Sequence, residues 1–260
     1  MINKTILFDE APLLAVRHQP GQYKPKDIRL KSNLYISPEY HLETLKFPQA
    51  LPTNHPEKTY IIRGNQEITF NSEFYTKITT PDQRTIYIAL EHNAAYLFAK
   101  EDKANGIISG NEELIHCDYP SHSDMGDFIP GNTFFSFFED NGITIENYLS
   151  ALKQLFPTMN LTFLQGIGKA DTYELADKLS FNTIQSLAHA YTPQQEKYIM
   201  SVDIDLFDAI ATNQVKSTEV LDRLATLAKK AIATYIVLSP DYIGKNTGCY
   251  YISELLRRIL

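Results

Sequence analysis

The chain has few of the residues that define several protein classes. It contains no tryptophan and only two cysteines, Cys117 and Cys249, in 260 residues, which is too few for a disulfide framework. No apolar run is long enough to cross a membrane, and the first residues lack the pattern of a signal peptide. We therefore expect a cytoplasmic protein with no membrane partner.

Positive charge is also scarce. The chain has 24 Lys and Arg against 31 Asp and Glu, which gives a net charge of −7 at pH 7. This balance disfavours a nucleic-acid partner, and it suits a cationic substrate without requiring one. Hydrophobic residues make up 43% and charged residues 21% of the chain, so the composition is that of a globular protein. Its length allows one large α/β domain or two small ones.

The clearest chemical pattern is an apolar run at 198–202 that ends in Asp203 and Asp205. Residues i and i+2 of a strand face the same side, so we expect the two carboxylates to point the same way. Like charges held so close raise each other's pKa, and a cation between them removes the penalty. A divalent metal site is one interpretation, and a solvated acidic loop is the other.

Two further apolar runs also end in metal-binding residue types. The run 85–90 is followed by Glu91 and His92, and the run 114–117 is followed by Asp118, His122 and Asp124. The carboxyl ends of parallel strands meet at one edge of a sheet, where α/β proteins place their sites. Imidazole and carboxylate without clustered cysteine suit Mn, Fe or Zn. The three strand ends together therefore favour a metal site.

The sequence pattern changes near residue 84. Residues 1–83 are rich in proline and read as irregular or β-rich, with a hairpin predicted from strands at 58–64 and 66–70. From residue 84, strands and helices alternate, which predicts a mainly parallel sheet with helices on both faces. We thus expect an N-terminal extension, 1–83, packed on an α/β domain, 84–260. The predicted strands lie at 85–90, 113–117, 161–166, 198–203 and 232–238, and the predicted helices at 92–103, 146–156, 218–231 and 250–260.

The order of these residues resembles the metal signature of the arginase/deacetylase superfamily. The matching motifs are Glu91-His92, then Asp118…His122-Ser123-Asp124, then Asp203-Ile204-Asp205-Leu206-Phe207-Asp208. The wider pattern is most similar to the peptide arginases, which convert arginine side chains to ornithine in ribosomally made peptides. That pattern includes 91–95, 116–125 and 239–242, and the resemblance spans about 84–260. Asp118 and His122 are four residues apart, whereas the family motif Asp-x-His-x-Asp places these two ligands two residues apart.

The resemblance implies a fold, an activity and a set of ligands. The fold would be an arginase-like three-layer sandwich, and the activity would be hydrolysis of the guanidino group of peptidyl arginine to ornithine and urea. The cofactor would be two Mn²⁺ ions per chain, bridged by Asp118 or Asp203. Asp124 would be both a ligand and the catalytic proton carrier. The implied metal ligands are His92, Asp118, His122, Asp124, Asp203 and Asp205.

Three other residues carry open interpretations. His116 precedes Asp118 on the same strand face, so it is either a ligand or a packed histidine beside the ligands, and we favour the packed histidine. Asp241 follows the last predicted strand, where it could hold a guanidinium group in a charge-assisted pair or serve as a turn residue. Asp208 is expected to orient its loop rather than bind metal.

Two other functions remain compatible with the sequence. One is a single-zinc deacylase of the same superfamily, which a metal count per chain would distinguish from a dinuclear enzyme. The other is a non-catalytic binding protein that kept the fold. The expected partner is an arginine-containing peptide, and the sequence gives no indication of the oligomeric state.

Overall fold

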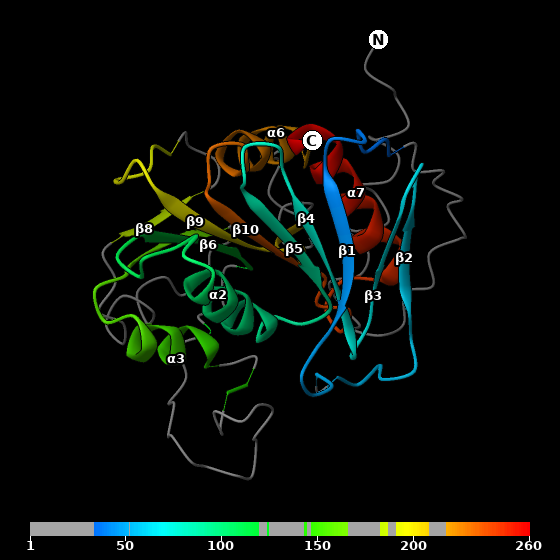
Figure 1. Cartoon of the computed structure of the whole chain (residues 1–260), viewed down its shortest axis with the longest axis horizontal. Coiled ribbons are helices and arrows are strands. Elements are labelled where there is room, and N and C mark those ends of the chain that lie inside the picture. The colour runs from blue at the N-terminus through cyan, green and yellow to red at the C-terminus, as the bar shows by residue number, and fades with distance from the viewer. Residues whose placement is uncertain are drawn as a thin grey trace.

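Figure 1 shows the computed structural model of the chain. It describes residues 34–51, 53–119, 124, 143–144, 147–165, 183–186, 191–207 and 217–260, and the statements below concern these residues.

The fold is built on an eight-stranded sheet with the spatial order β1-β4-β5-β10-β9-β6-β7-β8. In this order, the six strands from β5 to β8 are parallel to their neighbours. At the other side of the sheet, β4 pairs with β5 and β1 pairs with β4, both in antiparallel register. The prediction of a mainly parallel α/β sheet is confirmed. The strands of this sheet are β1 (His41–Lys46), β4 (Phe74–Thr79), β5 (Thr85–Ala89), β6 (Glu113–Asp118), β7 (Asn160–Gln165), β8 (Thr183–Ser186), β9 (Tyr198–Asp203) and β10 (Ala233–Val237).

Helices cover both faces of this sheet. Along β5 and β10, Tyr87 and Tyr235 pack in one apolar cluster, and Ile88 and Ile236 pack in a second one. The first cluster includes α2 (Ala94–Ala104) and α3 (Tyr148–Leu155), and the second includes α6 (Ser217–Ala228) and α7 (Lys245–Ile259). Since successive side chains of a strand alternate between faces, the two clusters define three layers, and Figure 1 shows the sheet in the middle.

The described part of the region 34–83 is mainly β-structure. The predicted hairpin is present as β2 (Tyr60–Arg63) and β3 (Glu67–Phe70), which pair in antiparallel register. In addition, β1 and β4 extend the large sheet, because β4 pairs with β5 from Thr76 to Thr79. Hydrogen bonds of the main sheet therefore join strands that lie before and after residue 84 in the chain. The division into an N-terminal extension and a separate domain stays a prediction.

The last helix shows why one predicted boundary was wrong. The sequence predicted a helix from residue 250, but α7 begins at Lys245 and includes Gly248. Glycine has a low helix propensity, so this turn was not expected to be helical. A Cβ at position 248 would lie 2.2 Å from Leu238 Cδ1. Glycine at this position therefore accommodates the close approach of α7 to Leu238 after β10.

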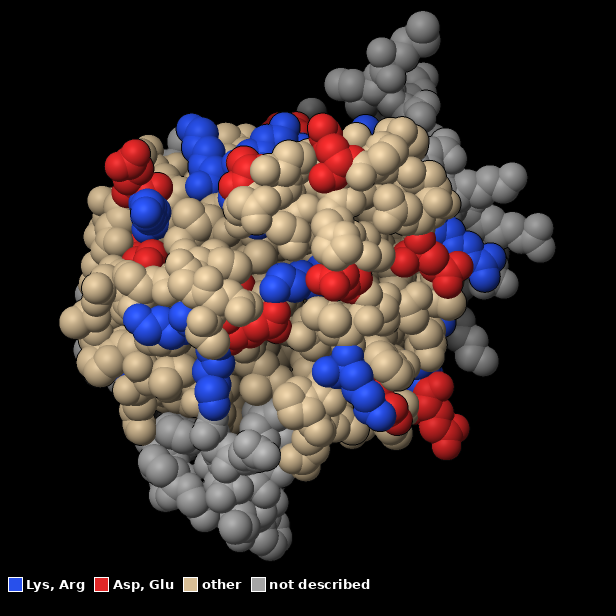
Figure 2. Space-filling model, in the orientation of Figure 1, with Lys and Arg blue, Asp and Glu red and all other residues tan. Residues whose placement is uncertain are grey.

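The visible surface carries charges of both signs. On the face shown in Figure 2, basic and acidic side chains are interspersed. The pair of Lys46 and Glu73 is typical, with 3.7 Å between the charged atoms and more than half of each side chain exposed. Such exposed pairs add little stability, so the two buried apolar clusters stabilise the fold. Among the described residues, no helix is long and apolar enough to span a membrane.

One buried carboxylate lies far from the ends of the strands that carry the predicted ligands. Asp102 of α2 is fully buried and accepts hydrogen bonds from the hydroxyls of Tyr87 at 2.7 Å and Tyr235 at 3.0 Å. Thr85 donates a weaker bond at 3.2 Å. Burial raises the pKa of Asp102 to about 6, although the two tyrosine hydroxyls oppose the rise.

This carboxylate predicts a pH-dependent stability term. Because the pKa of Asp102 is higher in the folded state, folding takes up a proton between about pH 4 and pH 6, and stability falls as pH rises through this window. Asp102→Asn should abolish this term. The free energy of unfolding of the wild type relative to the variant should decrease with pH by up to about 1.4 kcal/mol per pH unit. Denaturant unfolding of both metal-free proteins at several pH values measures the difference, and a constant difference would contradict it.

Candidate metal centre

Four neighbouring strands bring the predicted ligands to one edge of the sheet. Val237 of β10 lies opposite Ala89 of β5 on one side and Asp203 of β9 on the other. In the next pair, Cys117 of β6 lies opposite Val202, so Asp118 and Asp203 end their strands side by side. The prediction that these strands end together at one edge is confirmed.

The first group of candidate ligands joins His92, Asp118 and Asp203. One ligand atom from each lies within 4.8 Å of the others, and all three residues are buried. The Nε2 atom of His92 contacts Asp203 Oδ2, and its Nδ1 atom lies 2.9 Å from Asp124 Oδ2. His92 therefore reaches across β10, from the end of β5 to the end of β9.

The second group joins His116, Asp118 and Asp124, again within 4.8 Å of one another. His116 Nε2 lies 3.1 Å from Asp118 Oδ2 and 3.4 Å from Asp124 Oδ2. Since Asp118 belongs to both groups, the two groups are adjacent. Asp118 therefore lies between His92 and Asp203 on one side and His116 and Asp124 on the other.

His116 lies directly beside two of the predicted ligands, because its Nε2 atom faces Asp118 and Asp124. This position fits a ligand and also fits a packed histidine beside the ligands. The Tyr148 hydroxyl of α3 lies 3.1 Å from His116 Nδ1 and fixes the ring from the other side. The i, i+2 spacing of His116 and Asp118 on one strand was the signal for this arrangement.

Burial and crowding raise the pKa values of the site. Burial raises the pKa of Asp203 well above its usual value, and the charge of Asp205 raises it further. Burial alone would lower the pKa of His116, but its hydrogen bonds to Asp118 and Asp124 outweigh this effect and raise it to about 9. Burial alone would also lower the pKa of His92, but the charge and hydrogen bond of Asp124, together with the charges of Asp118 and Asp205, outweigh burial and raise it. The cluster of acids therefore favours positive charge in its centre.

Asp205 does not follow the geometry that the sequence suggested. The strand β9 ends at Asp203 and the chain turns there. The backbone N–H of Asp205 donates to Asp203 Oδ1 at 3.0 Å, so the two residues are not related as i and i+2 of one strand. Asp205 is fully buried and its charge acts on Asp203 and His92, but it belongs to neither ligand group found among the described residues.

Two non-glycine residues in the left-handed region shape the loops around the site. Asp124 has φ of 50° and Ser239 has φ of 48°, a conformation in which aspartate is enriched among non-glycine residues. The Asp124 carbonyl accepts a bond from Leu149 N at 3.1 Å, which ties it to α3. The Ser239 hydroxyl donates to Asp203 Oδ2 at 3.0 Å and orients that carboxylate.

Asp241 lies at the predicted edge, but its carboxylate already has protein partners. Asn54 Nδ2 donates to Asp241 Oδ2 at 2.7 Å, and His55 Nε2 lies 2.8 Å from Oδ1. Asp241 therefore connects the end of β10 to the segment that carries Asn54 and His55.

Some predicted residues lie outside the described residues. They are His122 and Asp208.

The donors present fit a hard or borderline divalent ion. They are carboxylate oxygens and imidazole nitrogens, which suit Mn, Fe or Zn. The nearby thiol of Cys117 packs in the apolar cluster with α6 and α7. Burial raises the pKa of this thiol, which disfavours the thiolate form that binds metals. A thiolate site is thus not what this edge offers.

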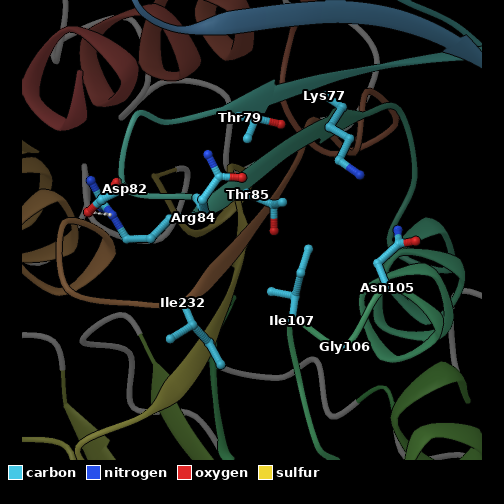
Figure 3. Close-up of a pocket in the computed structure, with 10 residues that line it drawn as sticks. Lys77, Thr79, Asp82, Arg84, Thr85, Asn105, Gly106, Ile107 and Ile232 are labelled. Carbon is cyan, nitrogen blue, oxygen red and sulfur yellow. Dashed lines mark hydrogen bonds and ion pairs between the residues drawn. The ribbon is translucent and has the colours of Figure 1, made fainter.

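A surface pocket lies at the other edge of the sheet. It is lined by Thr85, which begins β5, and by Ile232, which precedes β10 (Figure 3). Its cations are already engaged, because Lys77 pairs with Glu101 at 2.5 Å and Arg84 pairs with Asp82 at 2.7 Å. Because the pocket lies where β5 and β10 begin, it is separate from the candidate metal centre, which lies where these strands end.

No protein-family model and no curated protein matches the chain. Among the solved structures that match is the agmatine ureohydrolase of Thermoplasma volcanium, with 17% sequence identity and a TM-score of 0.39. The match covers 67% of this chain and 61% of that chain. At this level of similarity it carries no argument about the fold or the activity of this chain.

The charge pattern predicts opposite effects of one substitution with and without metal. Asp203→Asn removes a buried charge that Asp205 repels, so in a chelator the variant should be at least as stable as the wild type. With Mn²⁺, the wild type should gain melting temperature as the ion concentration rises, and the variant should gain much less. Thermal unfolding with chelator and with Mn²⁺ measures both effects.

The matched control is Asp222→Asn, which removes an exposed carboxylate paired with Arg258. It should respond to Mn²⁺ as the wild type does. An equal response of Asp203→Asn and the wild type would show that Asp203 is not a ligand.

Proposed function

We propose that this protein is a dinuclear metallohydrolase, with two Mn²⁺ ions per chain, that cleaves the guanidino group of arginine within a peptide to give ornithine and urea. The observation that carries this proposal is the convergence of His92, His116, Asp118, Asp124 and Asp203 at the carboxyl edge of β5, β9 and β6. The motifs at these positions, which resemble the arginase/deacetylase superfamily, add the substrate class.

The two groups of residues would each hold one ion. In this proposal His92, Asp118 and Asp203 hold one, and Asp118 and Asp124 hold the other, with His122 and Asp205 completing the set. Two divalent ions supply Lewis acidity, which favours ionisation of a water near neutral pH and polarises the atom under attack. His116 then either joins the second group or orients Asp118 and Asp124 through its Nε2 atom.

Asp124 is the proposed proton carrier. Its Oδ2 atom lies 2.9 Å from His92 Nδ1 and 3.4 Å from His116 Nε2, so it can exchange hydrogen bonds with both rings. In the reaction, a water oxygen adds to the guanidino carbon and the bond from that carbon to the side-chain nitrogen breaks. Asp124 takes the proton of the water and passes it to the leaving amine. The products are urea and an ornithine side chain.

The metal count tests the dinuclear centre. Metal analysis after loading with Mn²⁺ and removal of excess ion should give close to two Mn per chain. One tightly held Zn with no second ion would favour the single-zinc deacylase instead. That alternative is favoured by one observation, because Asp205 lies in neither group of ligands found among the described residues.

Substrate size tests the peptide assignment. Recognition of a peptide must extend past the side chain, so kcat/KM for an arginine inside a peptide should exceed that for free arginine. Mass spectrometry should show the loss of the amidine carbon with two nitrogens and two hydrogens, and a urea assay should match it. Equal or faster turnover of free arginine would assign the protein to small-molecule hydrolysis.

A further inference from the structure

Glu91, next to His92, is a buried acid without a full set of partners. Its side chain is 6% exposed, and Thr53 provides one hydrogen bond to it. The Oε1 atom has no hydrogen-bond partner in the structure. A buried acceptor without a partner costs free energy, so this atom favours a bound donor.

A second carboxylate faces the same region. The charge of Asp241 acts on Glu91, and both act on the hydroxyl of Tyr60, a residue at the start of β2. Burial first, then the charges of Cys249, Glu91 and Asp241, raise the pKa of this hydroxyl to about 12. The backbone shows the same neighbourhood, because Ser239 N donates to the Leu90 carbonyl at 3.0 Å. The segments that follow β5 and β10, which carry Glu91 and Asp241, therefore run side by side at the end of the sheet that carries the candidate metal centre.

The N-terminal segment fixes the orientation of Asp241. Lys58 Nζ lies 3.0 Å from His55 Nδ1, and because an ammonium group can only donate, His55 Nδ1 is the acceptor. His55 Nε2–H then donates to Asp241 Oδ1 at 2.8 Å, while Asn54 donates to Oδ2 at 2.7 Å. These two donors fix the orientation of the Asp241 carboxylate.

The cations near this cluster have other contacts. Lys245 Nζ donates to the carbonyl of Thr59 at 3.1 Å and lies 5.2 Å from the centre of the Tyr60 ring. Lys58 contacts His55. Neither makes an ion pair with Glu91 among the described residues. The charge of His92 acts on Glu91, but the ring of His92 makes its contacts with Asp124 and Asp203.

We infer that Glu91 and Asp241 form the binding site for the cationic group of the substrate, with Asn54 and His55 as positioning residues supplied by the N-terminal region. This inference rests on the proposed function. A guanidinium group suits the site, because its planar set of N–H donors can bond two carboxylates at once. The segment 53–55 would then be part of the substrate site.

The test uses two peptides that differ in charge and hardly in shape. One contains arginine, and the other contains citrulline, its neutral urea analogue. The Mn²⁺-loaded wild type should bind the arginine peptide more tightly in calorimetry. Glu91→Gln should weaken this binding by about ten- to a hundredfold and leave citrulline binding unchanged, and KM should rise more than kcat falls.

Two further variants keep the test independent of Glu91. Asp241→Asn should also lower the preference for the arginine peptide over the citrulline peptide. His55→Ala should lower it less, and His55→Gln, which keeps a donor, should restore it. Asp82→Asn, at the opposite edge of the sheet, removes the same charge and should change nothing. Each variant should keep the thermal response to Mn²⁺, which shows that it is folded and binds metal.

The outcomes separate this inference from the proposed function. If the wild type hydrolyses the arginine peptide and Glu91→Gln and Asp241→Asn keep the preference for arginine over citrulline, the cation site is wrong and the proposed function stands. If the wild type binds the arginine peptide through Glu91 without hydrolysing it, the cation site stands and the proposed function is wrong. A wild type without any preference for the arginine peptide overturns the cation site.

Discussion

Mutual repulsion of buried carboxylates is the constraint on which this structure depends. Asp118, Asp203 and Asp205 are fully buried at one edge of the sheet, where water cannot screen their charges. The parallel register of β6 and β9 forces the first two together. The rings of His92 and His116 lie against Asp203 and Asp118 and offset part of this repulsion with their N–H groups. A divalent cation would complete this compensation, so fold and proposed chemistry have one physical origin.

The parts of the chain that support this edge are distant in sequence. Tyr148 of α3 contacts His116, and the Ser239 hydroxyl after β10 orients Asp203. On the other side, Asn54 and His55 hold Asp241. A metal or substrate site built this way needs rigid neighbours to keep its ligands in place. The N-terminal region therefore contributes contacts to Asp241 as well as strands to the sheet.

Local patterns predicted the central elements well. The strand predicted at 198–203 matches β9, and the one at 85–90 matches β5 to within a residue, because buried parallel strands are continuous apolar runs. The strands β1 and β4 were missed. They are antiparallel strands added at the outer side of the sheet, next to β5, and β1 has a mixed sequence with no buried side chain. Only their pairing partners identify them as strands.

The sequence by itself determined the types of donors, the strands that carry them and the edge at which those strands end. Tertiary structure decided which donors meet. It turned the chain after Asp203, so that Asp205 left the strand geometry, and it brought the ring of His116 against Asp118 and Asp124. It also directed Asp241 toward Asn54 and His55. The physical reason is that a strand fixes side-chain direction by local alternation, whereas the turns beyond its end are set by contacts with residues far along the chain.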